Sequence, residues 1–153
     1  MKAEYINPIV QAVMSVGNSF FSNELKKGNL FVPEKLKEFD SLLISVGITG
    51  DLNGQCILSF QDDIIKQIAG AMMGMEINEI DEMSKSAVSE FCNMIMGNAA
   101  TFYSEVNNNI NISTPISISG KMSVSSDNVL LGLPIWISSN KKFEVYLSAK
   151  KSS

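Results

Sequence analysis

The sequence predicts an α+β fold in which a mainly antiparallel sheet packs against long helices. Helical spacing of apolar residues dominates the N-terminal part and one long segment at residues 79–106, whereas short alternating segments follow one another near residues 44–60 and beyond residue 110. Turn residues separate the alternating segments, which favours hairpins over strand–helix–strand crossovers. With 153 residues, 45% of them hydrophobic, we expect a single domain spanning residues 1–153.

The first expected helix begins at Asn7 and Pro8. Asn is a favoured N-cap residue, and Pro fits the first helical position because its missing N–H would have no partner there. Apolar residues then recur at helical spacing as far as Phe20. We expect Gly28 and Asn29 to end this helix.

A hairpin and a second helix should follow. Residues 44–49 and 55–60 both alternate between apolar and polar side chains, and the Asn-Gly pair at residues 53–54 is a strong signal for the turn between them. Residues 62–73 show helical spacing again, and Gly74 is placed to close that helix.

The longest helix is expected at residues 79–106, ended by the run of three Asn residues at 107–109. Short strand-like segments fill the remainder. They lie at residues 110–113, 116–124, 129–137 and 142–147, with turns at Asp127-Asn128 and Ser139-Asn140.

The composition excludes several classes of function. A net charge of −4 without a clustered basic surface argues against a nucleic-acid-binding protein. The absence of histidine excludes His-based triads, His-ligated metals and imidazole acid–base catalysis. Cys56 and Cys92 are far apart in sequence and in apolar surroundings, so buried free thiols are expected rather than a disulfide framework or a zinc site.

We expect a cytoplasmic protein that neither spans a membrane nor carries a signal peptide. Polar residues interrupt the apolar N-terminal segment, and no small-residue cleavage site follows it. The longest apolar run, residues 129–137, is shorter than the roughly 18 residues required to span a bilayer.

The long helix carries two contrasting faces. At about 100° per residue, an apolar face forms around one direction, and a polar stripe lies roughly 120° away from it. The expected core face contains Ile80, Met83, Ala87, Phe91, Ile95, Asn98 and Phe102. The polar stripe contains Ser86, Glu90, Asn93 and Gly97, and its Glu90 and Asn93 are neighbours because they are three residues apart.

Two interpretations of the stripe are open at this point. Ser, Glu and Asn on the outer side of an amphipathic helix are most often solvated surface. Alternatively, the stripe is a binding or catalytic surface, with Gly97 allowing close approach of another molecule because it has no side chain.

The stripe resembles the helix motif of the CheX branch of the CheC/CheX/FliY chemotaxis phosphatases. That motif has Asp or Ser, three residues, Glu, two residues and Asn, followed by a Pro about one strand downstream. In this chain it reads Ser86-Ala-Val-Ser-Glu90-Phe-Cys-Asn93, followed by Pro115, which stands one residue earlier than in the family pattern.

The resemblance extends over most of the chain. The N-terminal sequence Met-Lys-Ala-Glu-Tyr-Ile-Asn-Pro is CheX-like, and so are residues 47–55, 71–74, 81–86 and 97–100. The short motif alone is weak, because Glu4/Asn7 and Glu105/Asn108 also fit Glu-x-x-Asn without an Asp or Ser four residues before the Glu. CheC-like relatives carry two copies of the motif, so one credible copy favours CheX and a CheC/CheX-like fold.

The resemblance implies a phosphatase that hydrolyses the aspartyl phosphate of the response regulator CheY. The regulator would supply the Asp, a Mg²⁺ ion and a Lys, so this chain would bind no cofactor or metal itself. Asn93 would orient the attacking water, as a Gln does in GTPases. Glu90 would pair with the regulator's Lys. Ser86 would contact the partner or support the helix surface, and Gly97 would lie where the partner approaches.

Two other functions fit the same sequence. The chain could bind a phosphorylated regulator without hydrolysing it, or it could be a structural protein resembling those of the flagellar switch. The resemblance also implies a homodimer. The late strands, which include Trp136, could supply its interface, but burial within the sheet explains their apolar residues equally well.

Overall fold

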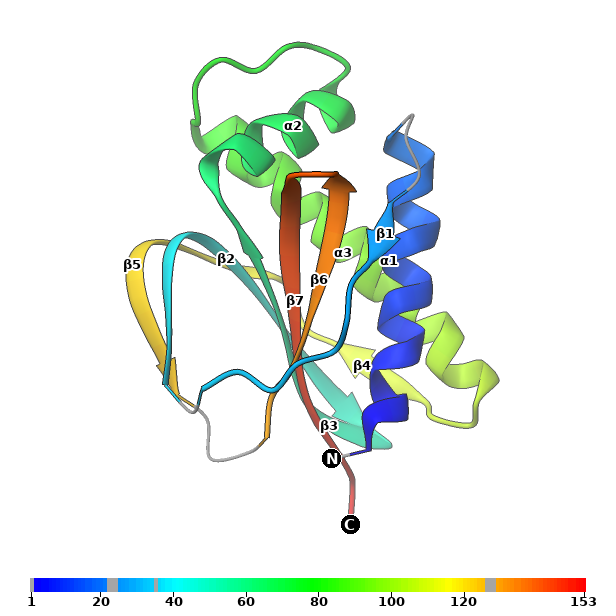
Figure 1. Ribbon diagram of the computed structural model, residues 1–153. Coiled ribbons are helices and arrows are strands. Elements are labelled where there is room, and N and C mark those ends of the chain that lie inside the picture. The colour runs from blue at the N-terminus through cyan, green and yellow to red at the C-terminus, as the bar shows by residue number, and fades with distance from the viewer. Residues whose placement is uncertain (1, 22–24, 35, 126–128) are drawn as a thin grey trace.

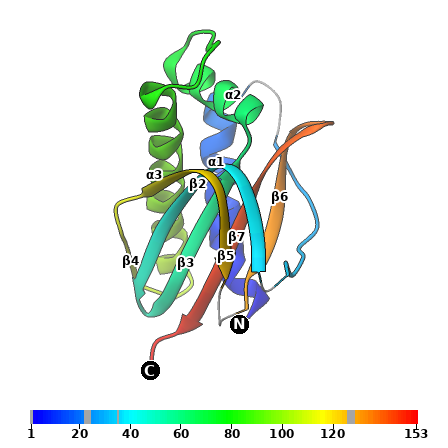
Figure 2. The same cartoon turned by 90° about the vertical axis from the view of Figure 1, so that its left-hand side faces the viewer.

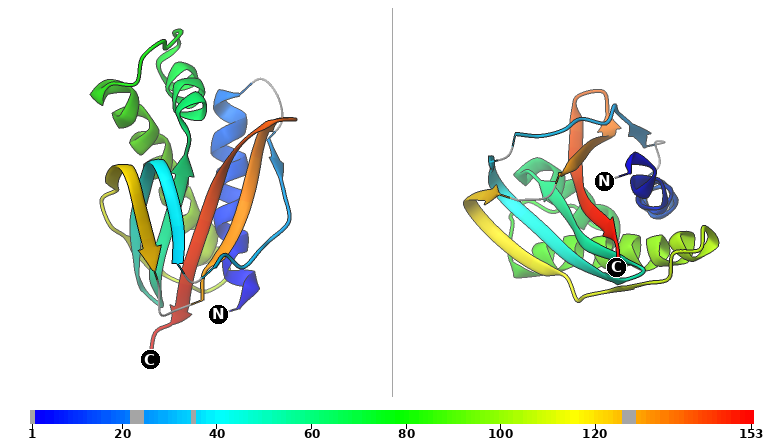
Figure 3. Two further views of the ribbon diagram at one scale, coloured as in Figure 1. Left: turned by 60° about the vertical axis from the view of Figure 1, so that its left-hand side comes forward. Right: turned by 90° about the horizontal axis from the view of Figure 1, so that it is seen from below.

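The computed structural model confirms an α+β architecture with an antiparallel sheet, and it describes residues 2–21, 25–34, 36–125 and 129–153. Within these residues the strands form a seven-stranded sheet in the order β1-β6-β7-β3-β2-β4, with β5 also paired to β2. The sheet curves strongly, as the view from below shows (Figure 3). The strands are β1 (Lys26–Lys27), β2 (Leu36–Gly50), β3 (Leu52–Phe60), β4 (Ile110–Ile112), β5 (Ile116–Ser125), β6 (Leu131–Ser138) and β7 (Lys141–Lys151).

The helices gather on one side of this sheet. A short 3₁₀ helix η1 (Ala3–Ile6) leads into α1 (Asn7–Phe20), which lies beside the long α3 (Glu82–Glu105) (Figure 1). The shorter α2 (Asp62–Met73) packs against α3 near the end of β3. Both chain termini lie at the end of the molecule away from α2 (Figure 1). Among the described residues, no helix is long and apolar enough to cross a membrane.

The first helix is shorter than predicted, and its start is different. Asn7 is the first residue of α1 rather than its N-cap, because η1 runs directly into the helix and Ile6 occupies the cap position. Pro8 does lie in the first turn. The helix ends at Phe20, well before Gly28, because the chain turns back to place Lys26 and Lys27 in β1 against β6.

The hairpin between β2 and β3 turns earlier than predicted. Its tip is Gly50-Asp51, where Gly50 has a φ of 108° that favours glycine, whereas the Asn-Gly pair at residues 53–54 lies within β3. Gly54 has a different role there. A side chain at that position would meet the Ser148 carbonyl of β7 at 1.8 Å, so the glycine permits close packing of two strands.

The later elements confirm most of the predicted boundaries. Helix α2 covers the predicted residues 62–73 and ends at Gly74, whose φ is 68°. The four late strands also form, and residues 139–140 make the turn between β6 and β7. The turn expected at Asp127-Asn128 lies outside the described residues.

The core lies between the sheet and the helices. Leu42, Ile44, Val46 and Ile48 of β2 point toward the helices and are buried with residues of β3, β6 and β7. Both cysteines are buried free thiols, as predicted. Trp136 is half-buried on β6, and Lys142 lies 5.2 Å from the centre of its ring. Most of the apolar residues of β6 and β7 are buried, so they mainly form part of the core.

The N-terminus of α3 is fixed by a reciprocal pair of hydrogen bonds. The Ser84 backbone N–H donates to the Asp81 carboxylate at 2.8 Å, and the Asp81 backbone N–H donates to Ser84 Oγ at 2.8 Å. This capping box satisfies two N–H groups that would otherwise have no partner. The hydrogen bond that the Ser84 backbone N–H donates to the Asp81 carboxylate is the main reason that the pKa of Asp81 lies below its ordinary value.

The buried face of α3 is rotated from the predicted one. Phe91 and Ile95 are buried as predicted, but Met83 and Asn98 are exposed. The buried residues are Ser84, Val88, Phe91, Cys92, Ile95, Met96, Ala99 and Tyr103. Their mean direction is roughly 160° from the polar stripe, so the stripe is almost opposite the core.

The capping box predicts a specific dependence of stability on pH. The pKa of Asp81 is lower in the folded state than the ordinary value of 3.8, so its carboxylate stabilises the fold above that value and loses this effect as the pH falls through the folded-state pKa. Asp81→Asn keeps the oxygen acceptor but removes the charge. Urea unfolding should therefore show that wild type is more stable than the variant at pH 7 and that this difference shrinks below about pH 4. A difference that is independent of pH would contradict the stabilising role of the Asp81 charge.

Candidate functional site

The four residues of the predicted stripe lie together on the outer side of α3. Ser86, Glu90, Asn93 and Gly97 are all exposed. Glu90 and Asn93 are one helical turn apart, which brings their side chains next to each other. Among the described residues, neither side chain has a hydrogen-bond or ion-pair partner. A carboxylate and a carboxamide are thus presented to solvent without internal partners.

Aromatic packing fixes the rotation of α3 directly behind these residues. Phe91 is fully buried, and its ring makes edge-to-face contacts with Phe20 and Phe21 at centroid distances of 6.4 and 6.3 Å. A third such contact joins it to Phe143 of β7 at 6.1 Å. Rotating α3 would pull this ring out of its pocket, so the packing holds Glu90 and Asn93 toward solvent.

Ser86, Glu90 and Asn93 of the stripe form part of one wall of an open groove of about 400 Å³. The opposite wall is the segment that follows β4, which runs alongside α3 (Figure 2). The groove is lined by Ser86, Ser89, Glu90 and Asn93 from the helix and by Ile112, Ser113, Thr114 and Pro115 from the sheet. The structure therefore brings Pro115 to the same groove as Glu90 and Asn93, although about 20 residues separate them in sequence.

Gly97 is the exception among the predicted site residues. It is exposed one turn beyond Asn93, outside the residues that line the groove, and a side chain at this position would have no atom within 4 Å. Sequence reasoning missed four residues of the groove: Ser89, Ile112, Ser113 and Thr114. Ser89 follows from the helical geometry, but nothing in the sequence pattern marked the segment after β4 as a facing wall.

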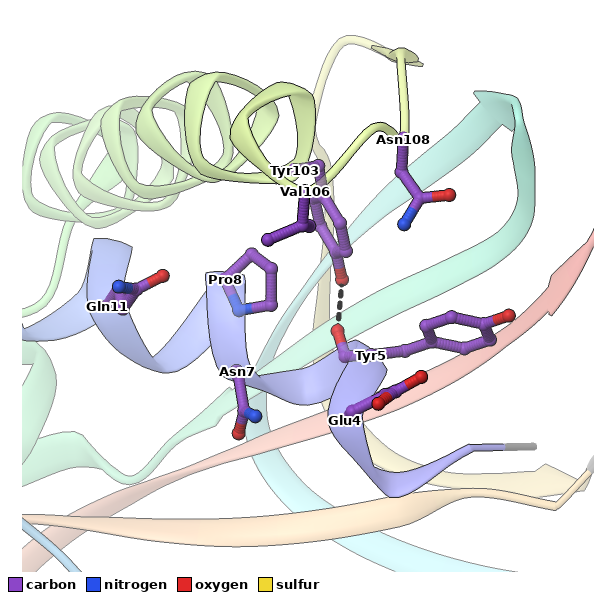
Figure 4. A pocket seen from close by; sticks show the side chains of 8 residues that line it. All are labelled: Glu4, Tyr5, Asn7, Pro8, Gln11, Tyr103, Val106 and Asn108. Atoms are coloured by element: carbon purple, nitrogen blue, oxygen red, sulfur yellow. Dashed lines mark hydrogen bonds between the residues drawn. The ribbon is translucent and has the colours of Figure 1, made fainter.

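The two other Glu-x-x-Asn pairs lie elsewhere. Glu4, Asn7 and Asn108 line a separate cleft of about 380 Å³ between the start of α1 and the end of α3 (Figure 4). The Tyr103 hydroxyl in this cleft donates to the Tyr5 carbonyl, which ties α3 to η1 at the entry to α1. Glu105, the first residue of the third pair, is exposed at the end of α3.

The thiol beside Asn93 is not a candidate nucleophile. Cys92 is fully buried, and burial together with the nearby Cys56 raises its pKa well above the ordinary value. Only the thiolate is a strong nucleophile, so Cys92 belongs to the core. Within the part of the chain that the structure describes, no three His, Cys, Asp or Glu side chains gather in a group that could hold a metal ion.

The surroundings of Gly97 predict a stabilising substitution. An Ala side chain has room there, and Ala lowers the entropic cost of ordering a helix relative to Gly, so Gly97→Ala should raise the free energy of unfolding by about 0.5–1 kcal/mol. Urea denaturation measures this change. Gly70→Ala in α2 is the matched control and should lower the free energy of unfolding, because its side chain would lie 2.9 Å from the Met75 carbonyl. A lower free energy of unfolding for Gly97→Ala would contradict the open space found beside Gly97.

Comparison with known proteins identifies the family. The family described as chemotaxis phosphatase CheX matches residues 42–133. The CheY-P phosphatase CheX of Thermotoga maritima is 32% identical over 152 residues, which cover 98% of each chain.

Solved structures share the fold over almost the whole chain. A chemotaxis protein CheX from Desulfovibrio desulfuricans is 26% identical with a TM-score of 0.84, covering 96% of this chain and 99% of that one. A chain of the CheX–CheY–BeF₃–Mg²⁺ complex from Borrelia burgdorferi is 20% identical with a TM-score of 0.82, covering 98% and 100%. The architecture and the sequence matches agree, and the chain belongs to the CheX family of chemotaxis phosphatases.

Proposed function

We propose that this chain hydrolyses the aspartyl phosphate of a CheY-type response regulator in the cytoplasm, using Asn93 and Glu90. The observation that carries the proposal is the exposed, unpartnered pair on α3, which faces Pro115 across an open groove. The relative from Thermotoga maritima, a CheY-P phosphatase, supports the substrate class.

The reaction requires little from the phosphatase beyond positioning. Water attacks the phosphorus atom, the bond between phosphorus and the aspartyl oxygen breaks, and the products are inorganic phosphate and the free carboxylate. The regulator supplies the phosphorylated Asp, a Mg²⁺ ion and a Lys close to the phosphoryl oxygens. Phosphoryl transfer depends mainly on orientation and charge stabilisation, so a held, in-line water is what a partner can add.

Asn93 is suited to hold that water. Its carboxamide offers both an acceptor oxygen and two N–H donors, so it can bind water in a defined orientation. The side chain is exposed on a helix whose rotation is fixed by Phe91, which allows it to enter the active site of another protein as a rigid unit. It has no internal hydrogen-bond partner, within the described residues, that would have to be broken first.

Glu90 is suited to dock the regulator. An exposed carboxylate one turn before Asn93 can pair with the regulator's active-site Lys and thereby fix α3 over the phosphoryl group. Ser86 extends the same face, and Gly97 leaves space for close approach of the partner beyond Asn93. The chain itself then binds no cofactor, and the Mg²⁺ belongs to the regulator.

Substitutions at the two residues should separate chemistry from docking. Asn93→Ala should lower the stimulated rate of phosphate release at least about 100-fold, because orientation of the water is lost, while regulator binding remains close to wild type. Glu90→Ala should instead weaken binding about tenfold or more through loss of a charge pair. Phosphate release from Mg²⁺-loaded phosphorylated regulator and titration with a BeF₃⁻-activated regulator measure the two effects.

Matched controls come from the same helix. Asn98 is exposed outside the stripe and Glu105 is exposed near the helix end, so Asn98→Ala and Glu105→Ala should retain wild-type rates. Wild-type rates in the Asn93 and Glu90 variants would overturn the site. Tight binding of activated regulator by the wild-type chain without any phosphate release would instead indicate a non-catalytic binding module.

We further propose that the chain forms a homodimer through β5. Strand β5 pairs with β2 along one edge and, among the described residues, has no partner along the other. Ile116 and Ile118 on this strand are 62% and 44% exposed. A long edge strand with exposed apolar residues is a site at which a second chain can pair, which makes β5 a better candidate than the buried strands β6 and β7.

The oligomeric state of point variants tests this interface. Wild type should have twice the single-chain mass of 16.7 kDa in light scattering coupled to size exclusion, and Ile118→Lys should convert it to the single-chain mass because a charge replaces an apolar contact. Ser119→Lys, on the opposite face of the same strand, should remain a dimer. A single-chain mass for wild type, or an unchanged mass for Ile118→Lys, would exclude the β5 interface.

A further inference from the structure

The wall opposite Glu90 and Asn93 contains an irregularity in strand pairing. Ile112 of β4 pairs with Ile48 of β2, whereas Ile116 of β5 pairs with Ser45. Residues 113–115 therefore lie opposite only residues 46–47, so one extra residue is inserted into the ladder. Such a β-bulge bends the strand and redirects its side chains, and bulges are frequent beside functional sites.

Ser113 holds this bulge through both its backbone and its side chain. Its backbone N–H donates to the Gly47 carbonyl at 3.0 Å, and its Oγ accepts the Gly47 N–H at 2.7 Å. The hydroxyl also donates to the Thr114 carbonyl at 3.2 Å. The Ser113 side chain thus supplies an acceptor for an N–H that a regular ladder would bond to a backbone carbonyl.

The neighbouring residues fit this arrangement. A Cβ at Gly47 would lie 3.3 Å from Ser113 Oγ, so glycine gives the hydroxyl room to reach the backbone. Pro115 has no N–H and cannot continue the ladder. Thr114 and Pro115 are therefore positioned mainly through Ser113, and both line the groove that contains Glu90 and Asn93.

We propose that Ser113 is a positioning residue of the phosphatase, which sets the wall formed by Thr114 and Pro115 so that the regulator can dock between that wall and α3. This inference rests on the proposed function. The side chains on this wall are Ile112, Ser113, Thr114 and Pro115, none of which is charged. The Ser113 hydroxyl is already occupied by Gly47 and Thr114. The wall therefore contributes to docking of the regulator and not to the reaction itself, which depends on Asn93.

Steady-state kinetics with phosphorylated regulator test this role. Ser113→Ala should raise KM about five- to tenfold, the effect of losing one hydrogen bond at the docking wall, while kcat changes less than about twofold. Ser113→Thr keeps the hydroxyl and should restore KM to near the wild-type value. Ser117→Ala, an exposed serine on β5 outside the groove, is the matched control and should behave like wild type.

Hydrogen exchange at Gly47 provides a readout that does not depend on catalysis. Its amide should be protected in wild type and Ser113→Thr and should exchange faster in Ser113→Ala. An unchanged KM in Ser113→Ala, or a fall in kcat at constant KM, would overturn the inference even if wild type is an active phosphatase. Absence of stimulated phosphate release by wild type would instead refute the proposed function, while the exchange of Gly47 would still report on the hydrogen bond.

Discussion

The structure depends above all on the burial of one face of α3. Phe91 packs among Phe20, Phe21 and Phe143, so a single side chain ties this helix both to the segment at the end of α1 and to the sheet. Since the interior is close-packed, α3 has one rotation that fills it. The same rotation leaves Ser86, Glu90 and Asn93 directed away from the core, where they are available to another protein.

Strand β2 provides the second constraint, because it brings the other half of the site to the helix. Its C-terminal part pairs with β4 and its earlier part pairs with β5. The hairpin tip at Asp51 also binds the chain just before β4, through hydrogen bonds with Asn109 at 2.9 and 2.7 Å. The short connection between α3 and β4, residues 106–109, is thus held in place at its end, and the bulge at Ser113 turns the chain into the groove.

The sequence predicted which helices and strands form better than it predicted the residues at which they begin and end. Helix α2 and its Gly74 end were predicted correctly, because helical spacing and a left-handed glycine coincide there. The hairpin turn was misplaced because glycine is also used where strands approach closely, and only the neighbouring strand β7 reveals that Gly54 has this role. The end of α1 was missed because pairing of Lys26 and Lys27 with β6 is a long-range effect.

The candidate site also has a part that local patterns predict and a part that only the tertiary structure reveals. Helical geometry alone brought Ser86, Glu90, Asn93 and Gly97 together, and the structure leaves all four exposed. The buried face of α3 was predicted less well, because α3 packs against α1, α2 and the sheet, and small residues such as Ala99 and Ser84 become buried without an apolar signal. The groove itself required the tertiary structure, since Ser113 and Thr114 approach α3 only through the pairing of β4 and β5 with β2.

A structure of this chain bound to a BeF₃⁻-activated, Mg²⁺-loaded CheY-type regulator tests the central claim most directly. We expect the Asn93 carboxamide at hydrogen-bond distance, about 3 Å, from the position of a water in line with the phosphoryl mimic. The Glu90 carboxylate should contact the regulator's Lys, and the wall at Thr114 and Pro115 should face the regulator. A regulator seated away from α3, or one whose active site is not reached by Asn93, would contradict the account.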